Sequence, residues 1–147
     1  MVTLRPLTAA DIPRAVKLWE ETAARTSDAD SSEELERLLE RNPDIGHVAE
    51  YQGAFVGLAI VAHDGRRGYF HHIGIVPQYR RHGIARKLAE LCFVALRNAG
   101  IIRVHIQLKD KNTLGLRFWK GLGCRERSDT VLISLRLSQT PDAGSEH

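Results

Sequence analysis

Cysteine is scarce in this chain, and its scarcity excludes a small protein held together by disulfides and a small protein built around a Cys-rich metal site. Only Cys92 and Cys124 occur among the 147 residues, too few for a disulfide framework and typical of a reducing compartment. The seven histidines are scattered, and no spacing of Cys and His matches a metal site. We therefore expect a cytoplasmic protein that binds no metal.

Long apolar runs are missing as well. No stretch approaches the roughly 20 apolar residues that a membrane helix needs, and residues 1–6 are typical of a strand and not of a signal peptide. The formal net charge is only +3, and no long basic stripe alternates with aromatic residues, as in nucleic-acid-binding surfaces. We therefore expect neither a membrane nor a nucleic acid as partner, and a nucleic-acid-binding domain stays the third of three hypotheses.

The length of the chain predicts one domain over residues 1–137, because domains typically run about 100–200 residues. Residues 138–147 hold Pro, Gly, Ser and acids, which is typical of a frayed tail. Hydrophobic alternation and turn residues predict strands over residues 2–5, 47–51, 54–62, 69–76, 101–108 and 124–137, the last as one strand or a pair.

Four helices are predicted between these strands. The first two begin at capping boxes, residues 8–11 and 31–34, and the others cover residues 84–98 and 112–120. The order is therefore β-α-α-β-β-β-α-β-α-β-β. It predicts an α/β (α+β) fold with a mixed, mostly antiparallel twisted sheet and helices on both faces.

The most informative stretch joins the strand predicted at residues 69–76 to the helix that begins at Ile84. Pro77 cannot continue a central ladder, so Gly83 lies at the start of the helix. Unpaired N–H groups and the helix dipole attract anions at such an end, and a residue without Cβ lets a phosphate approach the backbone. The cations around this turn are Arg80, Arg81, Arg86 and Lys87.

This arrangement predicts a pyrophosphate cradle. The turn is not a P-loop, and the dinucleotide Gly-x-Gly-x-x-Gly pattern is absent. The alternative stays open that the turn binds nothing, as is true of many strand-to-helix turns with Gly and Arg.

Two motifs resemble those of the GCN5-related N-acetyltransferase (GNAT) family. Arg80-x-x-Gly83-x-Ala85 resembles the family's (Gln/Arg)-x-x-Gly-x-(Gly/Ala) motif. Residues 112–124 resemble its Asn-x-x-Ala-x-x-Phe-Tyr-x-x-x-Gly-Phe motif. The resemblance covers nearly the whole chain and departs from the family pattern at Trp119, where Tyr is usual.

The resemblance implies transfer of acetyl from acetyl-CoA directly to a primary amine of a small molecule or peptide, in a ternary complex. A second hypothesis is an acyl-CoA-binding regulatory module with little transferase activity. In the family, the pantetheine arm of the coenzyme fills a wedge between the fourth and fifth strands. The sequence leaves open whether two copies of the chain form a homodimer. The coenzyme-binding residues that the resemblance implies are Ile73, Gly74, Ile75, Arg80, Arg81, His82, Gly83, Ile84, Ala85, Arg86, Asn112 and Trp119.

His71 is the candidate general base. In several family members a Glu or His on the fourth strand relays the proton of the acceptor, and His71 has the strand parity of Ile73 and Ile75. Its ordinary pKa near about 6.5 suits this role, although a structural His is the alternative. We expect His72 to face the other way and pack under a helix, and Glu50 is a weaker candidate base.

Trp119 cannot donate a proton as Tyr would, so we expect it to pack against the coenzyme or the core. Asn112 fits a helix N-cap, and the resemblance implies that it also contacts the coenzyme. The acceptor is not readable from the sequence. Arg66 and Arg67 could attract an acidic acceptor or be solvated turn residues. Asp28, Asp30 and Glu33 could help attract a cationic amine.

Overall fold

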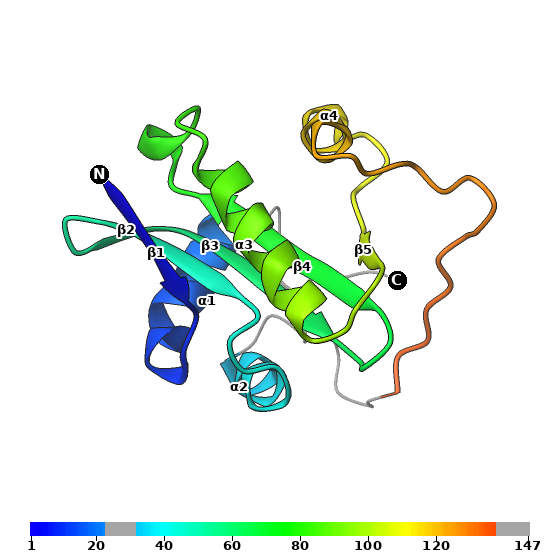
Figure 1. Ribbon diagram of the computed structural model, residues 1–147, viewed down its shortest axis with the longest axis horizontal. Coiled ribbons are helices and arrows are strands. Elements are labelled where there is room, and N and C mark those ends of the chain that lie inside the picture. Colours follow the sequence, from blue (N-terminus) through cyan, green and yellow to red (C-terminus); the bar gives the residue numbers. More distant parts are fainter. Residues whose placement is uncertain (23–31, 138–147) are drawn as a thin grey trace.

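The computed structural model describes residues 1–22 and 32–137, and its centre is a sheet (Figure 1). Among these residues, five strands follow the order β1-β2-β3-β4-β5. All neighbouring strands are antiparallel except β4 and β5, which are parallel. The predicted mixed, mostly antiparallel sheet is confirmed. The strands are β1 (Val2–Pro6), β2 (His47–Tyr51), β3 (Ala54–His63), β4 (Gly68–Ile75) and β5 (Val104–Ile106).

Helices cover both faces of the sheet, as predicted. Successive side chains of β3 explain this, because strand side chains alternate between the two faces. Leu58 and Ile60 pack in one core with α1 and α2, whereas Ala59 and Val61 pack in the other with α3. The described α-helices are α1 (Ile12–Thr22), α2 (Ser32–Arg41), α3 (Ile84–Asn98) and α4 (Thr113–Gly121).

The start of α1 is tied to the sheet by charge. A one-turn 3-10 helix, η1 (Ala9–Asp11), precedes it, and the Asp11 carboxylate accepts a hydrogen bond from the Thr8 backbone N–H (2.8 Å), as the predicted capping box requires. Arg5 of β1 donates to both oxygens of buried Asp11 (2.7 and 2.8 Å) and to Glu50 of β2 (3.1 Å). The hydrogen bonds from Arg5 hold the pKa of the Asp11 carboxyl well below its usual range.

Turn residues fix the end of α2 and the hairpin between β2 and β3. α2 ends before Asn42, whose buried side chain accepts a hydrogen bond from the backbone N–H of His63 (2.7 Å) and so joins the helix end to β3. The β2–β3 hairpin turns at Gln52 and Gly53, both with positive φ (50° and 81°). Such a left-handed pair matches the twist of the flanking strands.

Two strand predictions near the end of the chain are wrong. β5 is shorter than the predicted 101–108, because only residues 104–106 pair with β4. The Ile101 N–H bonds to the Leu96 carbonyl as α3 closes (3.0 Å), and the Asn112 N–H bonds to the Lys109 carbonyl before α4 (3.0 Å). Residues 124–137 form no strand within the described chain, since no neighbouring strand lies beside them to pair with (Figure 1).

Two predictions fall at least partly outside the described residues: the second capping box, which begins at Ser31, and the tail over residues 138–147. No helix in the part of the chain that the structure describes is both long enough and apolar enough to span a bilayer.

Candidate functional site

The turn from β4 into α3 has an open backbone corner at Gly83. A short 3-10 helix, η3 (Pro77–Tyr79), follows β4, and Gly83 then precedes α3 with a left-handed conformation (φ 76°, ψ 11°). A Cβ built on Gly83 would meet no heavy atom within 4 Å. Glycine is therefore favoured here by its backbone conformation, and the space in front of it is open.

The backbone N–H groups at the start of α3 make this corner a site for an anion. The Lys87 N–H is bonded to the Gly83 carbonyl in the first turn (3.1 Å). The N–H groups of Ile84, Ala85 and Arg86 consequently have no acceptor within the helix. The buried side chain of Ile84 anchors the helix start in the core. Unpaired donors and the positive end of the helix dipole both favour an anion.

Exposed cations surround the same corner. Arg80 donates from Nε to the carbonyl of Ile75 (3.0 Å), which ties the turn to the end of β4. Arg86 pairs with Glu90 one turn later (3.3 Å), an exposed contact of little energy. The structure thus brings together the predicted cradle residues Arg80, Arg81, His82, Gly83, Ile84, Ala85 and Arg86.

Beside the corner, the end of β4 has a free edge among the described residues. β5 pairs with β4 only over residues 68–70, so residues 71–75 have no β5 partner. Such an edge binds extended segments through main-chain hydrogen bonds. Ile73, Gly74 and Ile75, the strand residues predicted to bind the coenzyme, lie along it. The Ile75 side chain is buried in the core and its carbonyl already accepts from Arg80, so Ile75 offers little to a ligand at this edge.

A β-bulge at His71 changes the parity of β4. The pairing with β3 shifts register between Ile60 and Val61, which leaves His71 as an extra residue. Phe70 and Ile73 therefore pack in the same core although they are three positions apart. The parity argument that selects His71 fails across this bulge, and sequence alone gives no signal for the bulge.

The imidazole of His71 is exposed, and its ring lies 6.5 Å from the ring of Tyr69, which lies 5.9 Å from His105. Although solvent reaches the ring, the surrounding protein removes enough water to lower the pKa of His71 below its ordinary 6.5. A neutral, accessible imidazole can accept a proton at neutral pH.

His72 packs under α1, as predicted. Its ring stacks on Trp19 with centroids 5.4 Å apart, and its Nε2 lies 2.7 Å from Thr22 Oγ1. Burial lowers the pKa of His72 to about 4. A Cβ on Gly74 would come within 2.5 Å of Thr22 Oγ1, so glycine makes room for this contact. Sequence reasoning missed Thr22, which no motif marks.

The second motif has a structural role. Asn112 caps α4, and its Oδ1 accepts a hydrogen bond from the Gly115 N–H (2.8 Å), as predicted. Trp119 is only 4% exposed. Its ring packs edge-on against Phe70 (4.9 Å) and Phe118 (5.0 Å). The sequence predicts that Trp119 packs against the coenzyme or against the core, and its indole packs in the core. Almost none of its surface is left to contact a coenzyme.

The remaining candidates lie away from the corner. Glu50 stands on β2, two strands from β4, and is held by Arg5. Arg66 and Arg67 occupy the β3–β4 turn, where Asp64 Oδ1 accepts both of their backbone N–H groups (2.8 Å each). Of the acids that could attract an amine, Glu33 starts α2, and Asp28 and Asp30 lie outside the described residues.

Neither a metal nor a thiol is built into the corner. Within residues 1–22 and 32–137, no group of three or more His, Cys, Asp or Glu is placed to hold a metal ion. Cys92 is buried on α3, and burial raises the pKa of its thiol to about 12. Such a thiol stays protonated and is a poor nucleophile.

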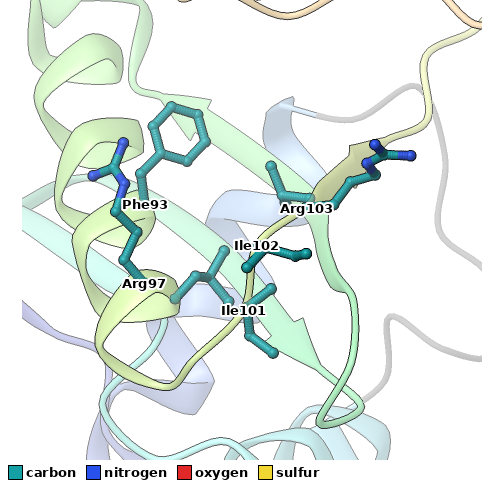
Figure 2. Close-up of a pocket in the computed structure, with 7 residues that line it drawn as sticks. Phe93, Arg97, Ile101, Ile102 and Arg103 are labelled. Atoms are coloured by element: carbon teal, nitrogen blue, oxygen red, sulfur yellow. The ribbon is translucent and has the colours of Figure 1, made fainter.

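A pocket of about 130 Å³ lies at the other end of α3 (Figure 2). The length of the helix, roughly 20 Å, separates it from Gly83. It is therefore not part of the corner. Its lining residues are Phe93, Leu96, Arg97, Ile101, Ile102, Arg103 and Val104.

Comparison with known proteins agrees with this geometry. The profile of the Acetyltransferase (GNAT) family matches residues 13–124. Acetyltransferase YE1169 of Yersinia enterocolitica is 28% identical over 134 residues, which cover 91% of this chain and 94% of the relative. Acetyltransferase ECA0875 of Pectobacterium atrosepticum is 28% identical over 127 residues, which cover 86% and 89%.

Solved structures share the fold. AAC(6')-Iy in complex with the bisubstrate analogue CoA-S-monomethyl-acetylneamine has a TM-score of 0.75 at 18% identity, over 92% of this chain and 99% of that one. The ribosomal-protein-S18-alanine N-acetyltransferase of Escherichia coli has a TM-score of 0.68 at 19% identity, over 84% and 77%. Because the family profile spans α1, the β4 edge, the Gly83 corner and α4, this chain belongs to the GNAT family and is an acetyl-transferring enzyme.

Proposed function

We propose that this enzyme moves acetyl from acetyl-CoA to a primary amine of a small molecule or peptide, by direct attack in a ternary complex. The observation that carries the proposal is the meeting of the Gly83 corner with the free edge of β4. The Gly83 corner suits a phosphate, and the free edge of β4 suits an extended chain that contains amides. Coenzyme A has both groups in one molecule.

Different residues would bind the two parts of the coenzyme. The N–H groups of Ile84, Ala85 and Arg86 would hold the pyrophosphate, with the exposed arginines supplying charge. The backbone of Ile73 and Gly74 would hold the pantetheine arm. Because Trp119 is buried and the Asn112 side chain is used in its cap, neither carries the binding argument.

The bound thioester would supply an activated acyl group whose carbonyl oxygen gains negative charge as the amine attacks; as the C–N bond forms, the C–S bond breaks and CoA leaves as its thiolate. A backbone N–H on the free edge of β4 would donate to that oxygen. An alkyl amine is protonated at neutral pH, since its ordinary pKa is near about 10.4. His71, neutral and exposed, would accept that proton directly or through water.

The state of the two cysteines supports direct attack of the amine on the thioester, without an acetyl-enzyme. Cys92 is buried with its pKa raised to about 12, and burial also raises the pKa of Cys124. Neither thiol is activated to carry the acetyl group. Initial rates at several concentrations of both substrates should therefore give intersecting lines in a double-reciprocal plot. Parallel lines would indicate an acetyl-enzyme and overturn direct attack.

The decisive experiment is a mass-spectrometric screen of amines with acetyl-CoA. The panel should include neamine-type aminoglycosides and peptides that begin with alanine, because the structural neighbours named above are described with these acceptors. We expect at least one amine to gain an acetyl group in an enzyme-dependent way. Heat-denatured protein is the control.

The regulatory module is the second candidate, and one observation favours it. Trp119 stands where the family often has a Tyr that can donate a proton, and it is buried in an aromatic cluster. This candidate predicts tight binding of acetyl-CoA by calorimetry with no turnover of any amine. Turnover of one amine excludes it.

A further inference from the structure

The ring of Tyr69 marks a part of the sheet that neither core covers. Tyr69 is half-buried and belongs to neither core cluster, although Phe70 beside it packs in the core with α3. Its ring lies near those of His105 (5.9 Å) and His71 (6.5 Å), so these three side chains share the face turned away from α3. Figure 1 shows α1 and α2 well away from β5. Within the described residues, no helix therefore closes this part of the sheet.

Two arginines extend this face toward the β3–β4 turn. The Asp64 N–H donates to the Arg67 carbonyl (3.1 Å), so the pairing of β3 with β4 reaches Arg67. A backbone N–H of β4 donates to the Arg103 carbonyl (2.9 Å), so the pairing with β5 reaches Arg103. Arg67 stands two positions before Tyr69, as Arg103 stands two positions before the ring on β5, and alternation places them on the same side. Figure 2 shows Arg103 extending away from α3. The open face is the name used here for residues 67, 69, 71, 103 and 105.

The charge at the arginine end of the open face is positive. Within residues 1–22 and 32–137, no acid forms an ion pair with Arg66, Arg67 or Arg103. Arg67 uses one N–H on the Arg66 carbonyl (3.2 Å). Asp64 belongs to the same turn, but its Oδ1 accepts two backbone N–H groups and its Oδ2 accepts from the Tyr69 hydroxyl (3.5 Å). The remaining guanidinium donors are free for an anion, and their planar fork matches a carboxylate.

We propose that the open face binds an acceptor that carries a carboxylate roughly 10 Å from its reactive amine. His71, the candidate base, stands at one end of the face, and Arg67 stands four residues before it. The β-bulge takes up one of these residues, which leaves three strand steps of roughly 3.3 Å each. The part of the acceptor between its amine and its carboxylate would lie over the Tyr69 ring. The inference rests on the proposed acetyl transfer and names its substrate class.

A peptide N-terminus followed by acidic residues has this geometry. An extended peptide rises about 3.4 Å per residue, so its third and fourth residues lie roughly 7–10 Å from the amine. Glutamate at these positions would reach Arg67 and Arg103 while the amine lies at His71. The Tyr69 ring would supply apolar contact area for the residues between them. A peptide with lysine at the same positions would meet like charge and bind poorly.

The first test compares three peptides that differ only at their third and fourth residues. They begin Ala-Ala-Glu-Glu, Ala-Ala-Gln-Gln and Ala-Ala-Lys-Lys and share one neutral remainder. With acetyl-CoA, we expect kcat/KM to be at least about tenfold higher for the Glu peptide than for the Gln peptide, and lowest for the Lys peptide. Raised salt should reduce the difference, because it screens exposed charges. Equal values for the Glu and Gln peptides would leave the transferase in place and overturn the acidic acceptor.

Charge reversal at the arginines gives a result that misfolding cannot imitate. Arg67→Glu and Arg103→Glu should each reduce the preference for the Glu peptide about tenfold, and the double variant should prefer the Lys peptide. Arg97→Glu is the matched control, because Arg97 is an exposed arginine on α3, on the other face of the sheet. It should keep the wild-type preference. A double variant that still prefers the Glu peptide would place the selecting charge elsewhere and overturn the assignment.

The last experiment measures binding without transfer, so this inference and the proposed function can fail separately. Each peptide is added to the isotope-labelled wild type in the presence of CoA, and backbone amide shifts are followed by NMR. Shifts at residues 67–71 and 103–105 with the Glu peptide, absent with the Lys peptide, support the open face. If they occur and no peptide is acetylated, the transfer proposal alone fails. Shifts confined to other residues, or none at millimolar peptide, overturn the acidic acceptor.

Discussion

His72 Nε2 lies 2.7 Å from Thr22 Oγ1, and the same hydroxyl donates to the Leu18 carbonyl at 2.7 Å. A hydroxyl has one hydrogen. Since that hydrogen goes to Leu18, the Thr22 oxygen accepts from His72, and Nε2 must carry the imidazole hydrogen. The Nε2 donor is thereby committed to α1, and burial keeps the ring neutral near pH 7 by lowering its pKa to about 4. His72 is therefore a fixed contact between β4 and α1, whereas the neighbouring His71 is exposed and stays the candidate base.

Loss of His72 should cost stability. His72→Ala removes a ring stacked on Trp19 and leaves the Thr22 hydroxyl without its donor, so we expect the free energy of unfolding to fall by about 2 kcal/mol. Thr22→Val is the matched variant from the other side of the contact and should cost about 1 kcal/mol. Urea titration measures both. Wild-type stability in His72→Ala would show that the stacking is unimportant.

The same residue predicts a pH dependence. The pKa of His72 is lowered from 6.5 to about 4 by burial, so the unfolded chain binds this proton more readily than the folded one. Stability should therefore be full above pH 6.5 and fall as the pH drops from 6.5 to about 4. The Tm of wild type and of His72→Phe, measured across this window, checks the assignment. An equally steep fall in the variant would place the effect in other groups.

His71→Ala should lower turnover by about 10²–10⁴-fold while the affinity for acetyl-CoA changes little. The rate of wild type should rise with pH through a pKa below 6.5, because the pKa of His71 is lowered. His105→Ala is the control, since His105 belongs to the same ring cluster through Tyr69 but lies on β5. If His71→Ala keeps its turnover and its acidic limb, the proton goes to water or to another group.

Gly83→Val should weaken the binding of acetyl-CoA at least about tenfold, because its side chain fills the space in front of the α3 amides. Gly100→Val is a matched control at the other end of α3. Both glycines have positive φ (76° and 86°) and open space around a built Cβ, so both variants carry similar backbone strain. Calorimetry should show a loss of affinity only in Gly83→Val. Equal affinities in the two folded variants would place the cradle elsewhere.

Trp119→Phe should leave the alkaline limb of the pH–rate profile in place, since an indole supplies no proton. Its stability should fall by about 1–3 kcal/mol, because the buried ring packs against Phe70 and Phe118. Kinetics and thermal melting of one preparation separate the two effects. A new alkaline pKa in Trp119→Phe would show that this position takes part in proton transfer.

The sequence predicts the backbone corner at Gly83 well and the side-chain placements around His71 poorly, for physical reasons. Gly83 and Pro77 act through local backbone restrictions that any chain with those residues obeys. The placement of His71 depends on a bulge, and the bulge depends on how β3 and β4 share one register. Thr22 lies fifty positions from His72, and only the packing of α1 on the sheet joins them.

Residues 131–137 give the same lesson at the end of the chain. Their alternating aliphatic residues predict a strand, and the strand is absent because pairing is a property of two segments and not of one. Asn112, by contrast, needs only the N–H of Gly115 a few residues away. A cap of this kind is local, so the sequence is enough to find it.

α1 is held at both of its ends. Arg5 and Asp11 fix its beginning to β1 and β2, and the contact between Thr22 and His72 fixes its last turn to β4. Tilting this helix would break a half-buried ion pair at one end or a hydrogen bond at the other. We therefore expect α1 to move as one piece with the sheet, so a ligand that contacts this helix would meet a preformed surface and recover little reorganisation free energy.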